Sequence, residues 1–142
     1  MGHSTENAKK KLASIERKIS SSLSEFIWGW DADTPAGVLG TALIDTGTTI
    51  ATMESMTGGV IGSAITDVSR SSNNYRGGFF KYQTQAKTDL GVSSDDIQTY
   101  GVVSAEVAQS MAKRAVELTK ADVGLSITGL AGPASDTSEP GT

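Results

Sequence analysis

A short β-prone run at residues 48–53 ends in a hydroxyl-rich turn that opens directly onto a glycine-led helix. The turn contains Ser55 and Thr57, and Gly58 and Gly59 follow at the start of the helix. The first N–H groups of a helix lack internal partners and the peptide dipoles add up there, so such a junction attracts anions. Ser55 in this position can serve as a nucleophile, a phosphate contact or an ordinary N-cap.

Composition removes several chemistries from consideration. The 142-residue chain has no cysteine, which excludes disulfides, thiolate nucleophiles and thiolate metal sites. Its one histidine, His3, lies at the extreme N-terminus, where we expect a terminal or tag-derived residue rather than a ligand. Catalysis by a Ser-His pair and histidine-rich metal sites are therefore not expected, and a nucleophile would have to be a hydroxyl or an activated water.

The net charge and the hydropathy of the chain predict its compartment and its classes of partner. The net charge of −4 argues against a nucleic-acid-binding surface. No apolar run approaches the length of a membrane span, and no signal peptide is visible. We expect a soluble, cytoplasmic protein with no nucleic-acid or membrane partner, and its length suits one domain with its own core.

Hydrophobic spacing predicts strands that alternate with helices. Thr34 is expected to cap a helix at 35–45 that turns Leu43 and Ile44 inward, and Ser104 a helix that continues to 119. Glu106 is interpreted as a capping-box partner of Ser104. The other expected elements are a helix at 5–27, strands at 48–53, 77–82 and 122–128, a helix at 57–67, a helical turn at 84–90 and a link from 91 to 103.

Alternation of this kind favours an α/β layered fold. In such sheets, ligands bind beyond the carboxyl ends of the strands. Two predicted strands end in turns of small and hydroxyl residues, at 55–59 and 128–132. If these turns are adjacent, they form a pocket floor suited to a phosphorylated or oxyanion-forming small molecule.

Four segments of the sequence follow one another in a recognisable order and spacing. They are A-T-M-E-S-M-T-G-G at 51–59, G-G-F-F-K-Y-Q-T-Q-A-K at 77–87, G-V-V-S-A-E-V-A at 101–108 and T-G-L-A-G-P at 128–133. Together they resemble the C-terminal domain of the CinA family, the competence/damage-inducible proteins, which includes nicotinamide mononucleotide deamidases. The resemblance covers about residues 35–142.

The resemblance implies a layered α/β/α sandwich with a central sheet, here without the family domain's last strand and helix. Residues 1–34 look like the helix and linker that join the two halves of full-length CinA proteins. Residues 35–142 correspond to the amidase-like domain. Because a sheet that lacks a strand exposes unpaired edge groups, we expect a homo-oligomer, another partner segment or a shortened form of a longer chain.

The resemblance also implies an activity, hydrolysis of the carboxamide of nicotinamide mononucleotide to nicotinate mononucleotide and ammonia, without a cofactor or metal. Ser55 would be the nucleophile, and Tyr82 and Lys87 would supply the base through a phenol relay or a lysine of lowered pKa. The substrate-binding residues would be Thr57, Gly58 and Gly59, for the oxyanion or phosphate, and Thr128, Gly129, Ala131 and Gly132 on the opposite wall.

Simpler structural roles exist for the same residues. Ser55 alone could cap a helix, Lys87 could be a solvated helix lysine, and Tyr82 could pack on its strand. The glycine pair could serve close helix–strand packing. The sequence also departs from the family pattern, with Met56 for a cysteine and Gln83-Thr84 for Ser-Asn. The alternative function is therefore a catalytically silent nucleotide-binding or assembly module of a CinA-type protein.

Overall fold

The computed structural model describes residues 5–130, and the chain divides into two compact units at residues 1–38 and 39–142. The first unit contains helix α1 (Thr5–Leu23) and the short 3₁₀ helix η1 (Ser24–Phe26). Together they confirm the helix predicted at 5–27. α1 buries none of its residues. Among residues 5–130, no helix is both long enough and apolar enough to cross a lipid bilayer.

Helix α2 (Pro35–Thr46) begins where the sequence predicts it. The Thr34 hydroxyl accepts a hydrogen bond from the Gly37 N–H at 3.1 Å, which satisfies one of the free donors of the first turn. Leu43 is buried as expected. The prediction that Ile44 also turns inward is wrong, because 48% of this residue is exposed. Successive residues of an α-helix are rotated by about 100° around its axis, so two consecutive side chains cannot both lie in a narrow packing interface.

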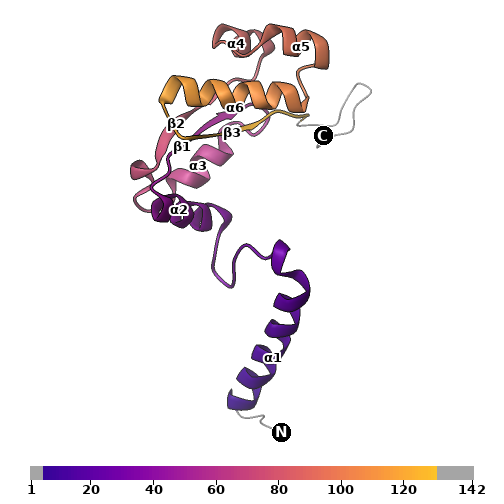
Figure 1. Ribbon diagram of the computed structural model, residues 1–142, viewed down its shortest axis with the longest axis vertical. Helices are drawn as coiled ribbons and strands as arrows, with labels where there is room; N and C mark the ends of the chain where they lie inside the picture. Colours follow the sequence, from indigo (N-terminus) through magenta and orange to yellow (C-terminus); the bar gives the residue numbers. More distant parts are fainter. Residues whose placement is uncertain (1–4, 131–142) are drawn as a thin grey trace. The chain divides into compact units, whose positions relative to one another are not determined.

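Within residues 39–130, three parallel strands form the sheet of the second unit, in the order β2-β1-β3 (Figure 1). β1 spans Ile50–Glu54, β2 spans Tyr75–Phe80 and β3 spans Val123–Ile127. All five residues of the central strand β1 are buried. Parallel strands are covered on both faces by the helices that connect them, which explains why β1 needs small or apolar side chains along most of its length. The predicted α/β class is confirmed.

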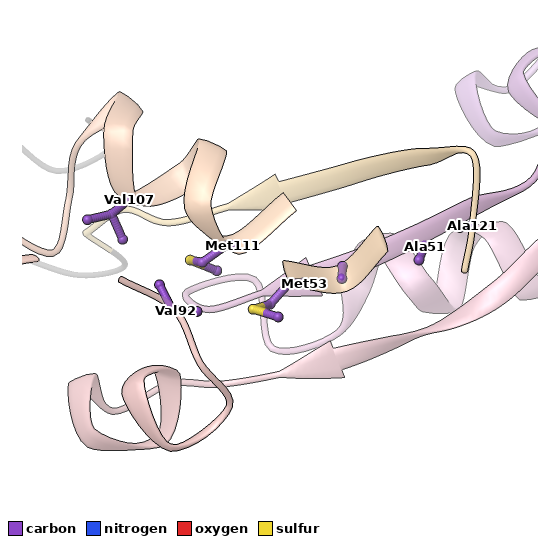
Figure 2. Close-up of a cluster of buried hydrophobic side chains, with 7 residues drawn as sticks. Ala51, Met53, Val92, Val107, Met111 and Ala121 are labelled. Carbon is purple, nitrogen blue, oxygen red and sulfur yellow. The ribbon is translucent and has the colours of Figure 1, made fainter. Parts of the chain in front are cut away.

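Helix α6 (Ala105–Thr119) covers one face of this sheet (Figure 1). Its buried residues Val107, Met111 and Ala115 meet Ala51 and Met53 of β1 in the hydrophobic core. Figure 2 shows Met53 and Met111 together in that core, with Val92 near them. Alternate residues of a strand point to opposite faces, so Thr52 and Glu54 project to the other face.

The opposite face carries helix α3 (Val60–Thr66), which follows β1 after the short turn and contacts β1 and β2 (Figure 1). A 3₁₀ helix, η2 (Ser71–Asn73), leads into β2. Tyr75, the first residue of β2, shares a hydrogen bond of 2.6 Å with the Thr52 hydroxyl beneath α3. The sheet therefore has helices on both faces, as a layered α/β arrangement requires.

The segment after β2 contains one helix that the sequence analysis missed. α4 (Thr84–Asp89) lies where a helical turn was predicted, but α5 (Ser94–Tyr100) occupies most of the region interpreted as a link. Its N-cap was visible in the sequence, because the Ser93 hydroxyl accepts a hydrogen bond from the Asp96 N–H and two acidic residues occupy the first turn.

The cap of α6 is confirmed in part. The Ser104 hydroxyl accepts a hydrogen bond from the Val107 N–H at 3.2 Å. The capping-box role assigned to Glu106 is not the observed arrangement, because Val107 and not Glu106 holds the third position of the helix.

Candidate functional site

The carboxyl end of β1 brings Ser55 and Lys87 together. Lys87 Nζ, from α4, donates a hydrogen bond of 2.9 Å to Ser55 Oγ and another of 3.0 Å to the Tyr82 carbonyl oxygen. Both residues are buried, with exposed fractions of 5% for Ser55 and 1% for Lys87. They are 32 residues apart in the sequence and meet because α4 follows the neighbouring strand β2.

Burial lowers the pKa of the Lys87 ammonium below its ordinary value. A charged amine loses its hydration in such a place, and among residues 5–130 no carboxylate forms a salt bridge with Lys87 to replace it. The neutral amine has a lone pair, and at 2.9 Å it can accept the Ser55 proton. The pair thus has the geometry of a hydroxyl nucleophile and its base.

Ser55 is held in place through its backbone. Its N–H donates to the Ile127 carbonyl of β3 at 3.1 Å, and its carbonyl accepts from the Gly58 N–H at 3.2 Å. The preceding carbonyl, of Glu54, accepts from the Lys81 N–H at 2.8 Å, directly after β2. Ser55 is therefore tied to both neighbouring strands at the point where the sheet ends.

Glu54, which the sequence analysis did not select, lies beside Ser55 and is only 2% exposed. One carboxylate oxygen accepts from the Gly62 N–H at 2.7 Å. The other accepts from the Thr57 hydroxyl at 2.7 Å and the Ile61 N–H at 3.0 Å. Burial raises the pKa of Glu54, but hydrogen bonds from these groups and from the Gly59 N–H outweigh it and hold the pKa below its ordinary value.

The glycine pair of the turn has a conformational role. Gly58 and Gly59 have φ angles of 66° and 98°, and no atom lies within 4 Å of the position a Cβ would take at either. Glycine is favoured there because side-chain-bearing residues rarely adopt positive φ, and not because a neighbouring element packs against it. The pair lets the chain reverse sharply between Ser55 and α3.

The other predicted site residues lie in different settings. The Tyr82 side chain is 64% exposed and its ring contacts Phe80, while its carbonyl, not its phenol, contacts Lys87. The Thr128 hydroxyl donates to the Val102 carbonyl at 2.9 Å, and Gly129 directly follows it. Ala131 and Gly132 lie outside the described residues.

Two cavities of the described residues lie away from the Ser55–Lys87 pair. A cavity of about 260 Å³ lies on the α3 face between Thr52, Glu54 and Tyr75. Another of about 460 Å³, lined by Tyr100 and Lys113 among others, lies along α5 and α6 and contains neither Ser55 nor Lys87. Within the described part of the chain, no group of three or more His, Cys, Asp or Glu side chains could hold a metal ion.

These observations define a class of protein, a parallel α/β domain with a buried Ser–Lys pair at the carboxyl end of its central strand. The profile of the CinA C-terminal domain matches residues 32–142. The chain belongs to the CinA C-terminal domain family, and the resemblance noted from the four sequence segments is confirmed.

Individual relatives agree with this assignment. A CinA-like protein of Desulfotalea psychrophila is 43% identical over 133 residues, which is 93% of this chain and 32% of that protein. A CinA-like protein of Rippkaea orientalis is 44% identical over 111 residues, which is 78% of this chain and 27% of that protein. The chain thus spans about a third or less of the length of these curated relatives.

Solved structures share the fold. The competence/damage inducible protein CihA from Agrobacterium tumefaciens has a TM-score of 0.68 at 36% identity, covering 74% of this chain and 64% of that one. A competence-damaged protein (CinA) superfamily protein from Escherichia coli has a TM-score of 0.68 at 34% identity, covering 78% of this chain and 68% of that one.

Proposed function

We propose that this chain hydrolyses the carboxamide of nicotinamide mononucleotide, releasing ammonia and nicotinate mononucleotide. The observation that supports this most directly is the buried hydrogen bond of 2.9 Å between Lys87 Nζ and Ser55 Oγ. Amide hydrolysis needs a nucleophile and a base that activates it, and this pair offers both. The substrate itself is carried over from the CinA family, to which the chain belongs.

In the proposed reaction, neutral Lys87 takes the Ser55 proton as Ser55 Oγ attacks the carboxamide carbon. The tetrahedral intermediate collapses as the Lys87 ammonium protonates the leaving nitrogen, and ammonia departs. Lys87, neutral again, then activates a water that hydrolyses the ester on Ser55. The lowered pKa of Lys87 suits this cycle, because the amine must gain and lose a proton near neutral pH.

The oxyanion requires donors that are not already used. Gly58 N–H donates to the Ser55 carbonyl, and the Gly59 N–H lies near enough to the Glu54 carboxylate to help lower its pKa. Among the hydrogen bonds of residues 5–130, the N–H groups of Met56 and Thr57 have no acceptor. We therefore assign the oxyanion to the N–H groups of Met56 and Thr57 and leave the glycines to shape the turn.

The test is ammonia release from nicotinamide mononucleotide by the purified chain, with Ser55→Ala as its partner variant. We expect turnover in the wild type and a loss of about three orders of magnitude or more in Ser55→Ala, with the fold retained by circular dichroism. Equal turnover in the two proteins would exclude Ser55 as nucleophile. Stabilisation of a folded wild type by the nucleotide with no product would favour the silent nucleotide-binding module instead.

A further inference from the structure

Glu54 and Ser55 are consecutive residues whose side chains serve opposite faces of the sheet. Ser55 meets Lys87 of α4, whereas the Glu54 carboxylate meets the start of α3. The two are joined by one peptide unit, so any movement of the Glu54 backbone moves Ser55. The position of Glu54 therefore bears directly on the Ser55 hydroxyl.

The Glu54 carboxylate accepts hydrogen bonds from the turn that follows Ser55 and from the start of α3. It takes the Thr57 hydroxyl and the N–H groups of Ile61 and Gly62, at 2.7 to 3.0 Å. Hydrogen bonds to a charged acceptor are among the stronger ones, and three such bonds leave the carboxylate little freedom. These hydrogen bonds hold the turn between Ser55 and α3 against the end of β1.

This arrangement also changes the expectation for anion binding. The sequence suggested that free N–H groups at the start of α3 would hold a substrate phosphate. In the structure, the chain's own carboxylate accepts hydrogen bonds from the N–H groups of Ile61 and Gly62, and the nearby Gly59 N–H also helps to lower its pKa. Glu54 is thus an internal anion at the place where an external one was expected.

We infer that Glu54 is a positioning residue: its carboxylate fixes the turn so that the Ser55 hydroxyl is held on Lys87. The inference rests on Ser55 being the nucleophile of the proposed function. Glu54 touches neither Ser55 Oγ nor Lys87 Nζ, so it acts through the backbone and the turn. Glutamine cannot replace it, because both carboxylate oxygens accept hydrogen bonds and the NH₂ group of an amide would meet a donor in either orientation.

The experiment measures how fast an alkyl fluorophosphonate labels Ser55, by mass spectrometry of the intact chain, in wild type, Glu54→Gln and Asp122→Asn. Asp122 is the matched control, because its carboxylate accepts from the Thr49 N–H at 2.8 Å and the Thr49 hydroxyl at 2.6 Å at the other end of the sheet. Asp122→Asn disturbs two hydrogen bonds of an exposed carboxylate and Glu54→Gln three of a buried one, but only Glu54 adjoins Ser55.

We expect Glu54→Gln to slow labelling by roughly tenfold or more, while Asp122→Asn labels at the wild-type rate. The midpoint of the labelling rate against pH should stay at the wild-type value, since Lys87 keeps its surroundings. Thr57→Val, which removes one partner of Glu54, should slow labelling by about threefold and serves if Glu54→Gln does not fold.

Labelling of Glu54→Gln within about twofold of wild type would overturn the inference. A shifted pH midpoint at an unchanged plateau would also overturn it, because Glu54 would then act on the Lys87 charge. An unreactive Ser55 in the folded wild type would remove the nucleophile and the inference together. A labelled wild type that releases no ammonia from nicotinamide mononucleotide would refute only the proposed substrate.

Discussion

At each end of β1 a carboxylate holds the neighbouring chain by hydrogen bonds, but the two carboxylates have different surroundings. At the amino end, Asp122 accepts two hydrogen bonds from Thr49, and the Asn74 side chain donates to the Leu43 and Thr48 carbonyls. At the carboxyl end, Glu54 accepts from Thr57, Ile61 and Gly62. In each case a carboxylate gathers a hydroxyl and backbone N–H groups that would otherwise lack partners.

The surroundings separate the two ends. Asp122 is exposed, and its hydrogen bonds to Thr49 lower its pKa with little cost from burial. At the carboxyl end, Glu54 is buried and the neighbouring residue contacts a buried amine. Burying an amine without a carboxylate partner costs stability, and the same burial lowers the pKa of Lys87, as its proposed role as a base requires. At the amino end the carboxylate holds the fold, whereas at the carboxyl end the proposed function would set the cost of burying Lys87 against its reactivity.

The largest effect is expected from Lys87→Met, which removes the base and keeps an unbranched apolar chain in the same place. Ammonia release should fall by about four orders of magnitude. Thermal unfolding at pH 7 should occur no lower than in wild type, because the penalty for burying an amine disappears. A variant with wild-type turnover, or one that melts well below wild type, would contradict this account of the carboxyl end.

The second largest effect is expected in the pH dependence of turnover and stability, which Lys87 at the carboxyl end of β1 should control. Because the pKa of Lys87 is lowered in the folded protein, turnover should rise with pH, about tenfold per unit, until the amine is neutral. Stability should also rise with pH between the folded and unfolded pKa of this lysine, because the unfolded chain binds the proton that the folded one rejects. Chemical denaturation of wild type and Lys87→Met at several pH values measures this difference, which should shrink as the pH rises through that window.

Gly62→Ala should show how closely the Glu54 partners are packed. A Cβ at Gly62 would lie 2.9 Å from the Tyr75 hydroxyl and 3.3 Å from Glu54 Oε1. Alanine normally favours a helix, but here we expect a loss of about 1–3 kcal/mol in the free energy of unfolding. Urea denaturation measures it. An increase in stability would mean that α3 shifts freely and that the donors of Glu54 are not rigidly held.

The smallest effect is expected from Asp122→Asn, at the amino end. Stability should fall slightly at neutral pH, and the deficit should vanish as the pH falls through the folded pKa of Asp122, where wild type loses the same charge. Ammonia release should be unchanged. A loss of turnover in a folded Asp122→Asn protein would show that the two ends are coupled through β1.

Local patterns predicted much of the fold. The caps at Thr34 and Ser104, the class of the sheet and the long helix after Ser104 follow from capping chemistry and hydrophobic period. Helix α5 was missed although Ser93 and Asp96 signalled its start, because its seven residues are too short for a clear periodicity. Ile44 was misplaced because sequence spacing does not show how wide a contact α2 makes.

The sequence by itself determined that a nucleophile would have to be a hydroxyl or an activated water, and that Ser55 would stand at the end of a strand before a helix. It also pointed to Lys87 through the family's motif. Only the tertiary structure decided that Lys87 Nζ reaches Ser55 Oγ in a buried setting, that Tyr82 contributes its carbonyl, and that Glu54 occupies the start of α3. Burial and long-range hydrogen bonds depend on which strands become neighbours, and residues 32 positions apart meet only when the sheet has formed.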